Sequence, residues 1–398
     1  MTTDYTGRRA LVVGGSIGGL TAALLLRRIG FDVAVFERTP TSLDGRGGGI
    51  VLQPDTLRWF RECSTRRPEE VSTSTHHVQY LGAHNEVLHS DATPWSYTSW
   101  GTFYRALLAD FGSEGYHLGE YAVGFDQDVD GVEVRFVSGR VEHADLVVFA
   151  DGISSPSRRR ISPGSELEYS GYVGWRGTVS EADVTSETFE LLRDAISYSV
   201  APYTHINIYP IPSPEGGRQP GERLLNFVWY RNVEAGPALD ELMTDKRGFL
   251  GGVSVHPGQV QDRFVAEMRQ TAAEVLAPAA VEVVHRTAEP YLQAVYDVRA
   301  TSMASGRVAL IGDAACAARP HAAAGTAKAA ANAWALHDAL REGSGDVADA
   351  LAKWEPTQLE LSERLLRRVQ DMGRRSQVDC TWAPGDPDLR FGLYGPGR

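Results

Sequence analysis

The feature that most constrains the fold is a glycine turn, residues 14–19 (Gly-Gly-Ser-Ile-Gly-Gly). It follows residues 10–13, a continuous apolar run that is typical of a strand buried on both faces. It precedes residues 20–28, which are rich in Ala and Leu and predict a helix, and a second apolar run at residues 33–36. A strand, a helix and a second strand in this order predict a β-α-β unit with parallel strands.

A turn of this kind lets the backbone approach the pyrophosphate of a dinucleotide. Gly14 can make the tight turn and Gly19 can lie where the helix packs on the strand, whereas Ser16 replaces the usual middle glycine. The helix after the turn points its N-terminal N–H groups at the phosphates. Glu37, at the end of the second strand, can accept hydrogen bonds from both ribose hydroxyls. A turn without a ligand is disfavoured, because its glycines cost conformational entropy.

The amino-acid composition argues against several classes of binding partner. With 39 basic and 51 acidic residues the net charge is −12, which disfavours nucleic acid because phosphate binding needs clustered Lys and Arg. The apolar run around the turn is too short and too interrupted to span a bilayer, so no membrane partner is expected. The three cysteines, Cys63, Cys316 and Cys380, lack CxxC spacing, which favours a reducing cytoplasm and offers no metal site. A homodimer is compatible with the sequence.

The length of 398 residues predicts two or three domains. Residues 170–235 are rich in aromatic and β-branched side chains and are broken by Pro and Gly loops, which predicts a mostly antiparallel sheet. Strand patterns like the first one recur at residues 145–150 and 307–312. The β-rich part is therefore expected to be inserted into the nucleotide-binding domain and to bind the substrate.

Further segments resemble motifs of the single-component (class A) FAD-dependent aromatic hydroxylases. The segment that begins with Asp151 and contains Arg158 resembles their DG motif, and residues 306–315 resemble their GD motif. Residues 48–54 resemble the loop that passes the edge of the isoalloxazine ring. Arg105 stands where the family usually has a basic contact to FAD. Four motifs in the same order make the resemblance specific.

The resemblance implies an α/β fold in which a Rossmann-like FAD-binding domain is interleaved with a smaller antiparallel-β substrate domain, as in p-hydroxybenzoate hydroxylase. The expected FAD-binding domain comprises residues 1–72, 95–168 and 290–375, the β-rich substrate domain residues 73–94 and 169–289, and a C-terminal tail residues 376–398.

The resemblance also implies the chemistry: FAD, with NADH or NADPH and O2, hydroxylates an electron-rich aromatic ring through a flavin C4a-hydroperoxide. Residues 171–177, 209–212 and 225–230 are most similar to the hydroxypyridine hydroxylases of the family, so a hydroxypyridine such as 2,6-dihydroxypyridine is the expected substrate. Another phenol or N-heteroaromatic ring, such as an indole, is the alternative. A flavin dehydrogenase or reductase is less favoured, because residues 150–290 lack a second dinucleotide fingerprint. A flavin-binding protein without catalysis is also open.

His321 is the candidate base or substrate anchor, because a histidine titrates near neutrality and this one lies in the loop expected to face the flavin. The alternative is a loop histidine that caps local backbone. Tyr209 and Tyr230 are candidates to line the substrate pocket, although aromatic residues on strands often belong to the core. The expected FAD-binding residues are Gly14, Ser16, Ile17, Gly19, Glu37, Arg38, Gly49, Val51, Arg105, Asp151, Arg158, Asp313 and Gly325. No metal is expected to take part.

Overall fold

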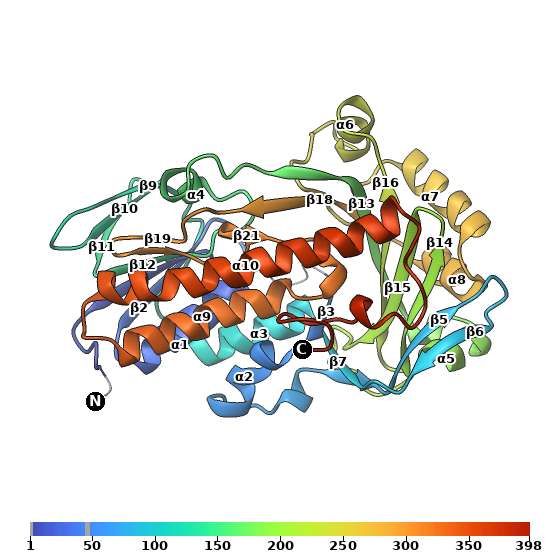
Figure 1. The fold of residues 1–398 in the computed structure, drawn as a ribbon, viewed down its shortest axis with the longest axis horizontal. Helices are drawn as coiled ribbons and strands as arrows, with labels where there is room; N and C mark the ends of the chain where they lie inside the picture. Colours follow the sequence, from blue (N-terminus) through green and yellow to red (C-terminus); the bar gives the residue numbers. More distant parts are fainter. Residues whose placement is uncertain (1–2, 44–47) are drawn as a thin grey trace.

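The computed structural model describes residues 3–43 and 48–398. Two sheets lie next to each other, a parallel one on the left of Figure 1 and a larger, mainly antiparallel one on the right. The long helix α10 (Val347–Gln377) runs across both of them and ties them together. It continues without a break through Pro356.

The parallel sheet has six strands in the order β19-β20-β12-β1-β2-β8. Their bounds are β19 (Ala304–Ser305), β20 (Val308–Leu310), β12 (Leu146–Phe149), β1 (Arg9–Val13), β2 (Asp32–Glu37) and β8 (Tyr116–Leu118). All neighbours are parallel except β19 and β20. The predicted β-α-β unit is present, with strands whose apolar residues are buried on both faces.

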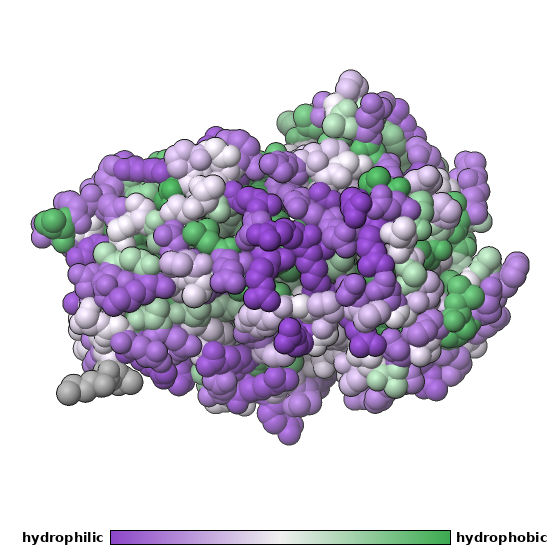
Figure 2. Space-filling view, in the orientation of Figure 1, coloured by the Kyte–Doolittle hydropathy of each residue, from purple (hydrophilic) through white to green (hydrophobic). Residues whose placement is uncertain are grey.

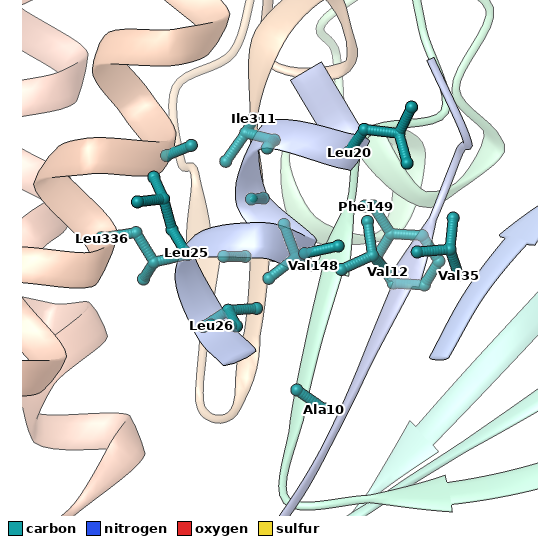
Figure 3. Packing of buried hydrophobic residues seen from close by; sticks show 14 of the residues in the cluster. Ala10, Val12, Leu20, Leu25, Leu26, Val35, Val148, Phe149, Ile311 and Leu336 are labelled. Carbon is teal, nitrogen blue, oxygen red and sulfur yellow. The ribbon is translucent and has the colours of Figure 1, made fainter. Parts of the chain in front are cut away.

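Helices cover one face of this sheet and a small sheet packs near the other. The helices are α1 (Ile17–Arg28), α2 (Pro54–Glu62), α3 (Trp100–Phe111) and α9 (Gly325–Glu342). The small sheet consists of β9 (Ala122–Gln127), β10 (Val132–Phe136) and β11 (Val141–Ala144). Figure 3 shows the resulting core, in which Val12, Val35 and Phe149 lie on adjacent strands while Leu25 of α1 lies against Leu336 of α9.

The glycine turn is fixed by close backbone contacts. Gly14 has a φ of +110°, and a Cβ at this position would collide with the carbonyl of Ala150. A Cβ at Gly19 would collide with the carbonyl of Gly14, because α1 packs directly against the turn. Both positions therefore require glycine for steric reasons that come from the β-α-β geometry itself.

The larger sheet has nine strands. Along its length lie β17 (Ser254–Val255), β18 (Tyr291–Arg299), β13 (Glu168–Ser180), β16 (Leu224–Asn232), β15 (Thr204–Ile211), β14 (Ala195–Ala201), β5 (His77–Leu81) and β6 (Val87–Asp91), while β21 (Cys316–Ala317) pairs with β18. Only β14 and β5 run parallel; the other pairs are antiparallel, as predicted for residues 170–235. The division of the chain into the two expected domains remains a prediction.

One face of the larger sheet is covered by helices and the other is turned toward the parallel sheet. The outer layer contains α5 (Ser186–Leu192), α6 (Pro237–Met243), α7 (Asp262–Val275) and α8 (Pro278–Arg286). Val173 and Trp175 of β13 belong to the core under these helices. Because side chains alternate along a strand, Gly174 and Arg176 point to the opposite face, toward the interior of the molecule.

Shorter elements and the C-terminal segment fill the region between the sheets. They include β3 (Gly49–Leu52), β4 (Thr73–Thr75) and β7 (Trp95–Ser99), which form a three-stranded sheet, and α4 (Pro156–Ile161). Residues 378–398 return from the end of α10 toward β3 and β7 (Figure 1), and Leu389, Phe391 and Leu393 are buried there. The outward face of α10 is hydrophilic (Figure 2).

Candidate active site

A cavity of about 280 Å³ lies beside the glycine turn, and we call it the turn cavity. It opens at the carboxyl ends of β1, β2 and β12, which is where doubly wound sheets bind ligands. Its lining consists of Val13, Gly14, Ser16, Phe36, Glu37, Arg38, Thr39, Leu43, Trp100, Glu120, Tyr121, Ala122, Ala150, Asp151, Gly152, Ile153 and Pro156. Four of the expected FAD-binding residues from the first β-α-β unit therefore come together here.

Glu37 is buried and holds the turn. The N–H of Gly15 donates to its Oε2 and the N–H of Thr39 donates to its Oε1, both at 2.9 Å. The carbonyl of Gly15 in turn accepts from the hydroxyl of Tyr116 at 2.9 Å. Each carboxylate oxygen keeps a further lone pair, so Glu37 can fix the turn and still accept a hydrogen bond from a ribose in the turn cavity.

Asp151 follows β12 and lines the same cavity. Neither of its carboxylate oxygens has a hydrogen-bond partner among the described residues, although both are buried. Burial raises the pKa of Asp151 to about 6. A buried carboxylate without a partner is costly, and it marks a place where a bound ligand supplies donors.

Arg158, which also belongs to the predicted DG motif, is not part of the described lining of the turn cavity. Its Nε donates to the carbonyl of Ser165 at 2.9 Å and its Nη1 donates to the carbonyl of Ala314 at 3.1 Å. Burial lowers its pKa. Arg158 therefore ties α4 to the short helix η3 (Gly312–Ala314), which carries the GD motif.

A second cavity, of about 350 Å³, lies against the interior face of the larger sheet, and we call it the sheet cavity. Its lining consists of Gly49, Ile50, Val51, Ile153, Gly174, Arg176, Asn207, Tyr209, Val228, Tyr230, Val253, Gln293, Ala294, Val295, Tyr296, Asp313, Ala317, Ala318, Pro320, Ala323, Ala324, Gly325, Thr326 and Phe391. Ile153 lines both cavities, so they adjoin at the loop after β12.

Asp313 lines the sheet cavity with a half-exposed side chain. Its Oδ1 accepts a 2.9 Å hydrogen bond from Nζ of Lys328, which is fully buried and also donates to the carbonyl of Cys316. The pKa of Lys328 is raised, because the Asp313 carboxylate outweighs the effect of burial. Asn332 supports the same loop, since its Oδ1 accepts from the N–H of Gly312 at 3.0 Å.

These residues fit an extended dinucleotide such as FAD. The turn and the N-terminus of α1 suit a pyrophosphate, and the unpartnered Asp151 lies beside them. The helix α9 begins at Gly325 in the lining of the sheet cavity, where its N-terminal end favours negative charge on a bound ring. Because the two cavities share Ile153 in their linings, the adenosine half and the ring half of one extended ligand would lie next to each other.

The candidate base His321 is buried beside the sheet cavity. Its Nε2 lies 2.7 Å from the hydroxyl of Tyr172, and its Nδ1 has no partner among the described residues. Its ring is 4.7 Å from that of Tyr230, which does line the cavity. The described lining includes Pro320 but not His321 itself. Burial, with His205 and Arg319 nearby, lowers the pKa of His321 well below its usual value, so the imidazole is neutral at pH 7.

Tyr209 and Tyr230 both line the sheet cavity, on neighbouring strands β15 and β16. Burial raises the pKa of Tyr230 to about 12 and that of Tyr209 further. Tyr209 stacks on Tyr97 with ring centroids 4.9 Å apart. Both phenols are protonated at neutral pH, so they can donate hydrogen bonds to a ligand.

The remaining predicted FAD-binding residues are spread around the two cavities. Gly49 and Val51 line the sheet cavity, and the N–H of Gly49 donates to Oδ1 of Asn226 at 2.8 Å. Ile17 is buried at the first position of α1. Arg105 lies on α3, whose first residue lines the turn cavity, and its Nη2 is 3.4 Å from Oγ1 of Thr102.

Sequence reasoning did not single out three side chains of the sheet cavity region, Arg176, Asn226 and Lys328. Arg176 and Asn226 lie in segments that resemble the hydroxypyridine hydroxylases, and strand alternation puts both on one face of the sheet without deciding which face is the interior one. Lys328 stands alone in an Ala-rich helix. No pattern in the sequence connects it with Asp313.

Fold and cavities together define a Rossmann-type flavoprotein with an attached β-sheet substrate region. A family model for an NAD(P)-binding Rossmann-like domain matches residues 12–45, and one described as FAD binding domain-like matches residues 169–297. The chain belongs to the class A FAD-dependent aromatic hydroxylases. It is a monooxygenase that uses FAD and NAD(P)H to hydroxylate an aromatic ring, and the predicted fold class, cofactors and reaction are confirmed.

Among its relatives is 2,6-dihydroxypyridine 3-monooxygenase of Paenarthrobacter nicotinovorans, with 38% identity over 98% of this chain and 96% of that protein. The solved structure of 2,6-dihydroxypyridine-3-hydroxylase from Arthrobacter nicotinovorans has a TM-score of 0.91, with 97% of each chain covered and 38% identity. HpxO of Klebsiella pneumoniae, solved with FAD and uric acid, shares the fold at 21% identity, with a TM-score of 0.78 over 97% of this chain and 91% of that one.

None of the helices in residues 3–43 and 48–398 combines the length and the apolar character that are needed to cross a bilayer.

Proposed function

We propose that the aromatic substrate is a hydroxypyridine such as 2,6-dihydroxypyridine, which is hydroxylated with NAD(P)H and O2. The observation that carries this proposal is the 38% identity to 2,6-dihydroxypyridine 3-monooxygenase, which extends over 98% of the chain and so includes the whole substrate region. Another phenol or N-heteroaromatic ring is the second candidate, since relatives at lower identity include proteins named 3-hydroxybenzoate 6-hydroxylase and 3-amino-4-hydroxybenzoate 2-monooxygenase.

The sheet cavity supports a small polar ring as substrate. Its volume of about 350 Å³ lies at the lower end of the range of small-molecule sites, which suits a small ring. When bound, FAD supplies the oxygen-transfer chemistry. The chain binds the cofactor through the turn and Glu37, orients the ring with protonated phenols at Tyr209 and Tyr230, and excludes water with the buried face of the sheet.

We assign the thirteen expected FAD-binding residues to this cofactor site, with Asp313 on the side of the sheet cavity and Gly14 to Gly19 on the side of the pyrophosphate. His321 is assigned to proton transfer through its contact with Tyr172, or to substrate anchoring. Its unpartnered Nδ1 supports a contact with the substrate, and the lowered pKa, which makes the imidazole a weak base, favours the anchoring role. The ring of Tyr230, which lines the cavity, lies 4.7 Å from that of His321 and brings the histidine close to the proposed substrate position.

We infer that the enzyme works in the cytoplasm, free or as a homodimer, without nucleic acid as a partner. The net charge of −12 argues against binding to phosphate backbones. The three cysteines are unpaired, which fits a reducing compartment.

Product analysis tests the proposed substrate. The purified protein, loaded with FAD, is incubated with NADH or NADPH, O2 and either 2,6-dihydroxypyridine, a phenol or an indole. We expect NAD(P)H oxidation to accelerate with the pyridine and one hydroxyl group to be added to it. Hydroxylation of the phenol or the indole alone would contradict the hydroxypyridine and leave the reaction class intact.

A further inference from the structure

Three strands of the larger sheet bring polar side chains with unpartnered atoms to one place. Nε of Arg176 on β13, Nδ2 of Asn226 on β16 and the hydroxyl of Tyr291 on β18 are all buried, and none has a hydrogen-bond partner among the described residues. Arg176 is paired in register with Tyr291, and Asn226 lies two residues further along the adjacent strand. The pleat turns all three side chains to the interior face.

The segment before β3 shows how closely these groups converge. A Cβ placed on Gly48 would lie 2.8 Å from the Tyr291 hydroxyl, 3.0 Å from Oδ1 of Asn226 and 3.6 Å from Nη1 of Arg176. A Cβ on Gly49 would lie 2.8 Å from the hydroxyl of Tyr209. A guanidinium, an amide and two phenols therefore converge around Gly48 and Gly49, beside the part of the sheet cavity that Arg176 and Tyr209 line.

The chemistry of this corner is that of a donor set. The guanidinium has donors only, and protonated phenols donate one hydrogen bond each. The Oδ1 of Asn226 is used by the N–H of Gly49, so its free group is the NH2 donor. Unpartnered donors in a buried cavity are costly, and they are satisfied by an acceptor that a ligand brings.

The charge of Arg176 is also uncompensated. It forms no ion pair with any carboxylate in the part of the chain that the structure describes. The one carboxylate of the described cavity lining, Asp313, is already paired with Lys328. Arg176 is partly buried, with its Nε enclosed and unpartnered, and an oxyanion is the group that its planar fork binds best.

We propose that Arg176 is a specificity-determining residue that binds an oxyanion carried by the substrate ring, with Asn226, Tyr209 and Tyr291 as additional donors. The enzyme thus takes a hydroxylated ring in its deprotonated, enolate form, and Arg176 discriminates against rings without an ionisable oxygen. Deprotonation places electron density on the ring, which is the form that an electrophilic oxygen attacks. This inference rests on the proposed function, because it names the ionisation state in which that substrate binds.

Equilibrium binding to the FAD-loaded enzyme without NAD(P)H tests the proposal. The probes are 2,6-dihydroxypyridine and its uncharged analogue 2,6-dimethoxypyridine, followed by changes in flavin absorbance or by calorimetry. In R176Q we expect the dissociation constant for the dihydroxypyridine to rise at least about tenfold, which corresponds to the loss of a charge-assisted hydrogen bond. Binding of the dimethoxy analogue and of FAD should change less than about twofold.

Two further variants complete the test. R231Q is the matched control, because Arg231 lies on β16 of the same sheet but pairs with Glu267 at 3.5 Å outside the cavity, and its affinities should stay at the wild-type values. N226D keeps the acceptor for the N–H of Gly49 but puts a carboxylate next to Arg176, so it should also weaken binding of the dihydroxypyridine. It keeps the proposal testable if R176Q does not fold.

The outcomes separate this inference from the proposed function. Equal loss of affinity for both probes, or loss of FAD affinity instead, would overturn the role of Arg176 in oxyanion binding. A wild-type enzyme that binds ring anions through Arg176 but forms no hydroxylated dihydroxypyridine would contradict the proposed substrate and support the inference. If the wild type hydroxylates the dihydroxypyridine but R176Q and N226D bind it as tightly as the wild type, the proposed substrate would be supported and the role of Arg176 contradicted.

Discussion

The ammonium of Lys328, which is fully buried, donates a 2.9 Å hydrogen bond to the half-exposed carboxylate of Asp313. The two residues are 15 positions apart, on α9 and on η3, so the bond connects the helix with the GD motif at the sheet cavity. It holds the carboxylate in one orientation and balances its charge next to the place where we put the flavin.

We expect K328M to bind FAD at least about tenfold more weakly than the wild type. The substitution removes a hydrogen bond between charged groups, worth about 1.5–3 kcal/mol, and leaves Asp313 without its partner. FAD titration of the apoprotein by fluorescence quenching measures the change. K353M is the control, because Lys353 makes an exposed pair with Asp349 on α10 and should leave FAD affinity unchanged. Equal affinities in K328M and the wild type would exclude the positioning role of Lys328.

Asp151 gives a prediction about the stability of the apoprotein at different pH values. Its folded pKa of about 6 lies above its ordinary value of 3.8, because burial disfavours the charged carboxylate. The folded state therefore binds more protons than the unfolded state between these values, and stability falls as the pH rises from about 4 through 6. The expected loss is about 3 kcal/mol, and it is complete above about pH 7.

D151N should not show this loss, because an amide does not titrate. Urea unfolding of both apoproteins at pH 4 and pH 7.5 gives their free energies of unfolding. The difference between D151N and the wild type should change by the expected loss between the two pH values. D183N is the control, since Asp183 is exposed at the surface, and it should follow the wild type at both pH values. If the free energies of unfolding of D151N and the wild type differ by the same amount at both pH values, Asp151 does not have a raised pKa.

The parts of the fold that could be predicted from the sequence are those encoded by local pattern. Residues 10–37 combine a buried strand, a sterically required turn and a helix, and each of these signals is contained within a few residues. The antiparallel sheet follows from alternation and turn residues in the same way. The expected turn, Glu37 and Asp151 meet at one cavity because parallel strands bring their carboxyl ends to one edge.

The parts that were missed depend on contacts between distant segments. The direction of Arg176 is decided by which face of β13 the helices α7 and α8 cover, and alternation alone leaves both faces open. Residues 376–398 have no periodicity and were expected to be a tail, yet Phe391 lines the sheet cavity. Its position is set by packing against Trp95 and Tyr198, with ring centroids 5.4 and 6.5 Å away.

The ion pair of Glu181 and Arg223 predicts a large effect on stability. Both side chains are fully buried, at most 1% exposed, and Nη2 of Arg223 lies 2.7 Å from Oε1 of Glu181. E181Q leaves the guanidinium buried without its counter-charge, which should lower the free energy of unfolding by about 3–5 kcal/mol. Chemical denaturation at a fixed, saturating FAD concentration measures the loss. The exposed pair of Arg193 and Glu190 is the comparison, and E190Q should cost less than about 1 kcal/mol.

Gly373 on α10 predicts a steric effect at the group around His321. A Cβ at this position would lie 2.6 Å from the hydroxyl of Tyr172 and 3.1 Å from both Nε2 of His321 and Nη1 of Arg319. G373A should therefore force Tyr172 and His321 apart, at a cost of about 1–3 kcal/mol. The better helix propensity of Ala offsets this by up to about 1 kcal/mol, so a net destabilisation is expected.

Thermal and urea unfolding of G373A measure this balance. G252A is the control, because a Cβ at Gly252 meets no atom within 4 Å and its φ is not in the left-handed region, so its stability should stay within about 0.5 kcal/mol of the wild type. G373A could be as stable as the wild type or more stable only if Tyr172 and His321, which are hydrogen-bonded at 2.7 Å, had room to move away from α10. That result would contradict the close packing of α10 against these two side chains. In that case α10 could not hold His321 in place beside the sheet cavity.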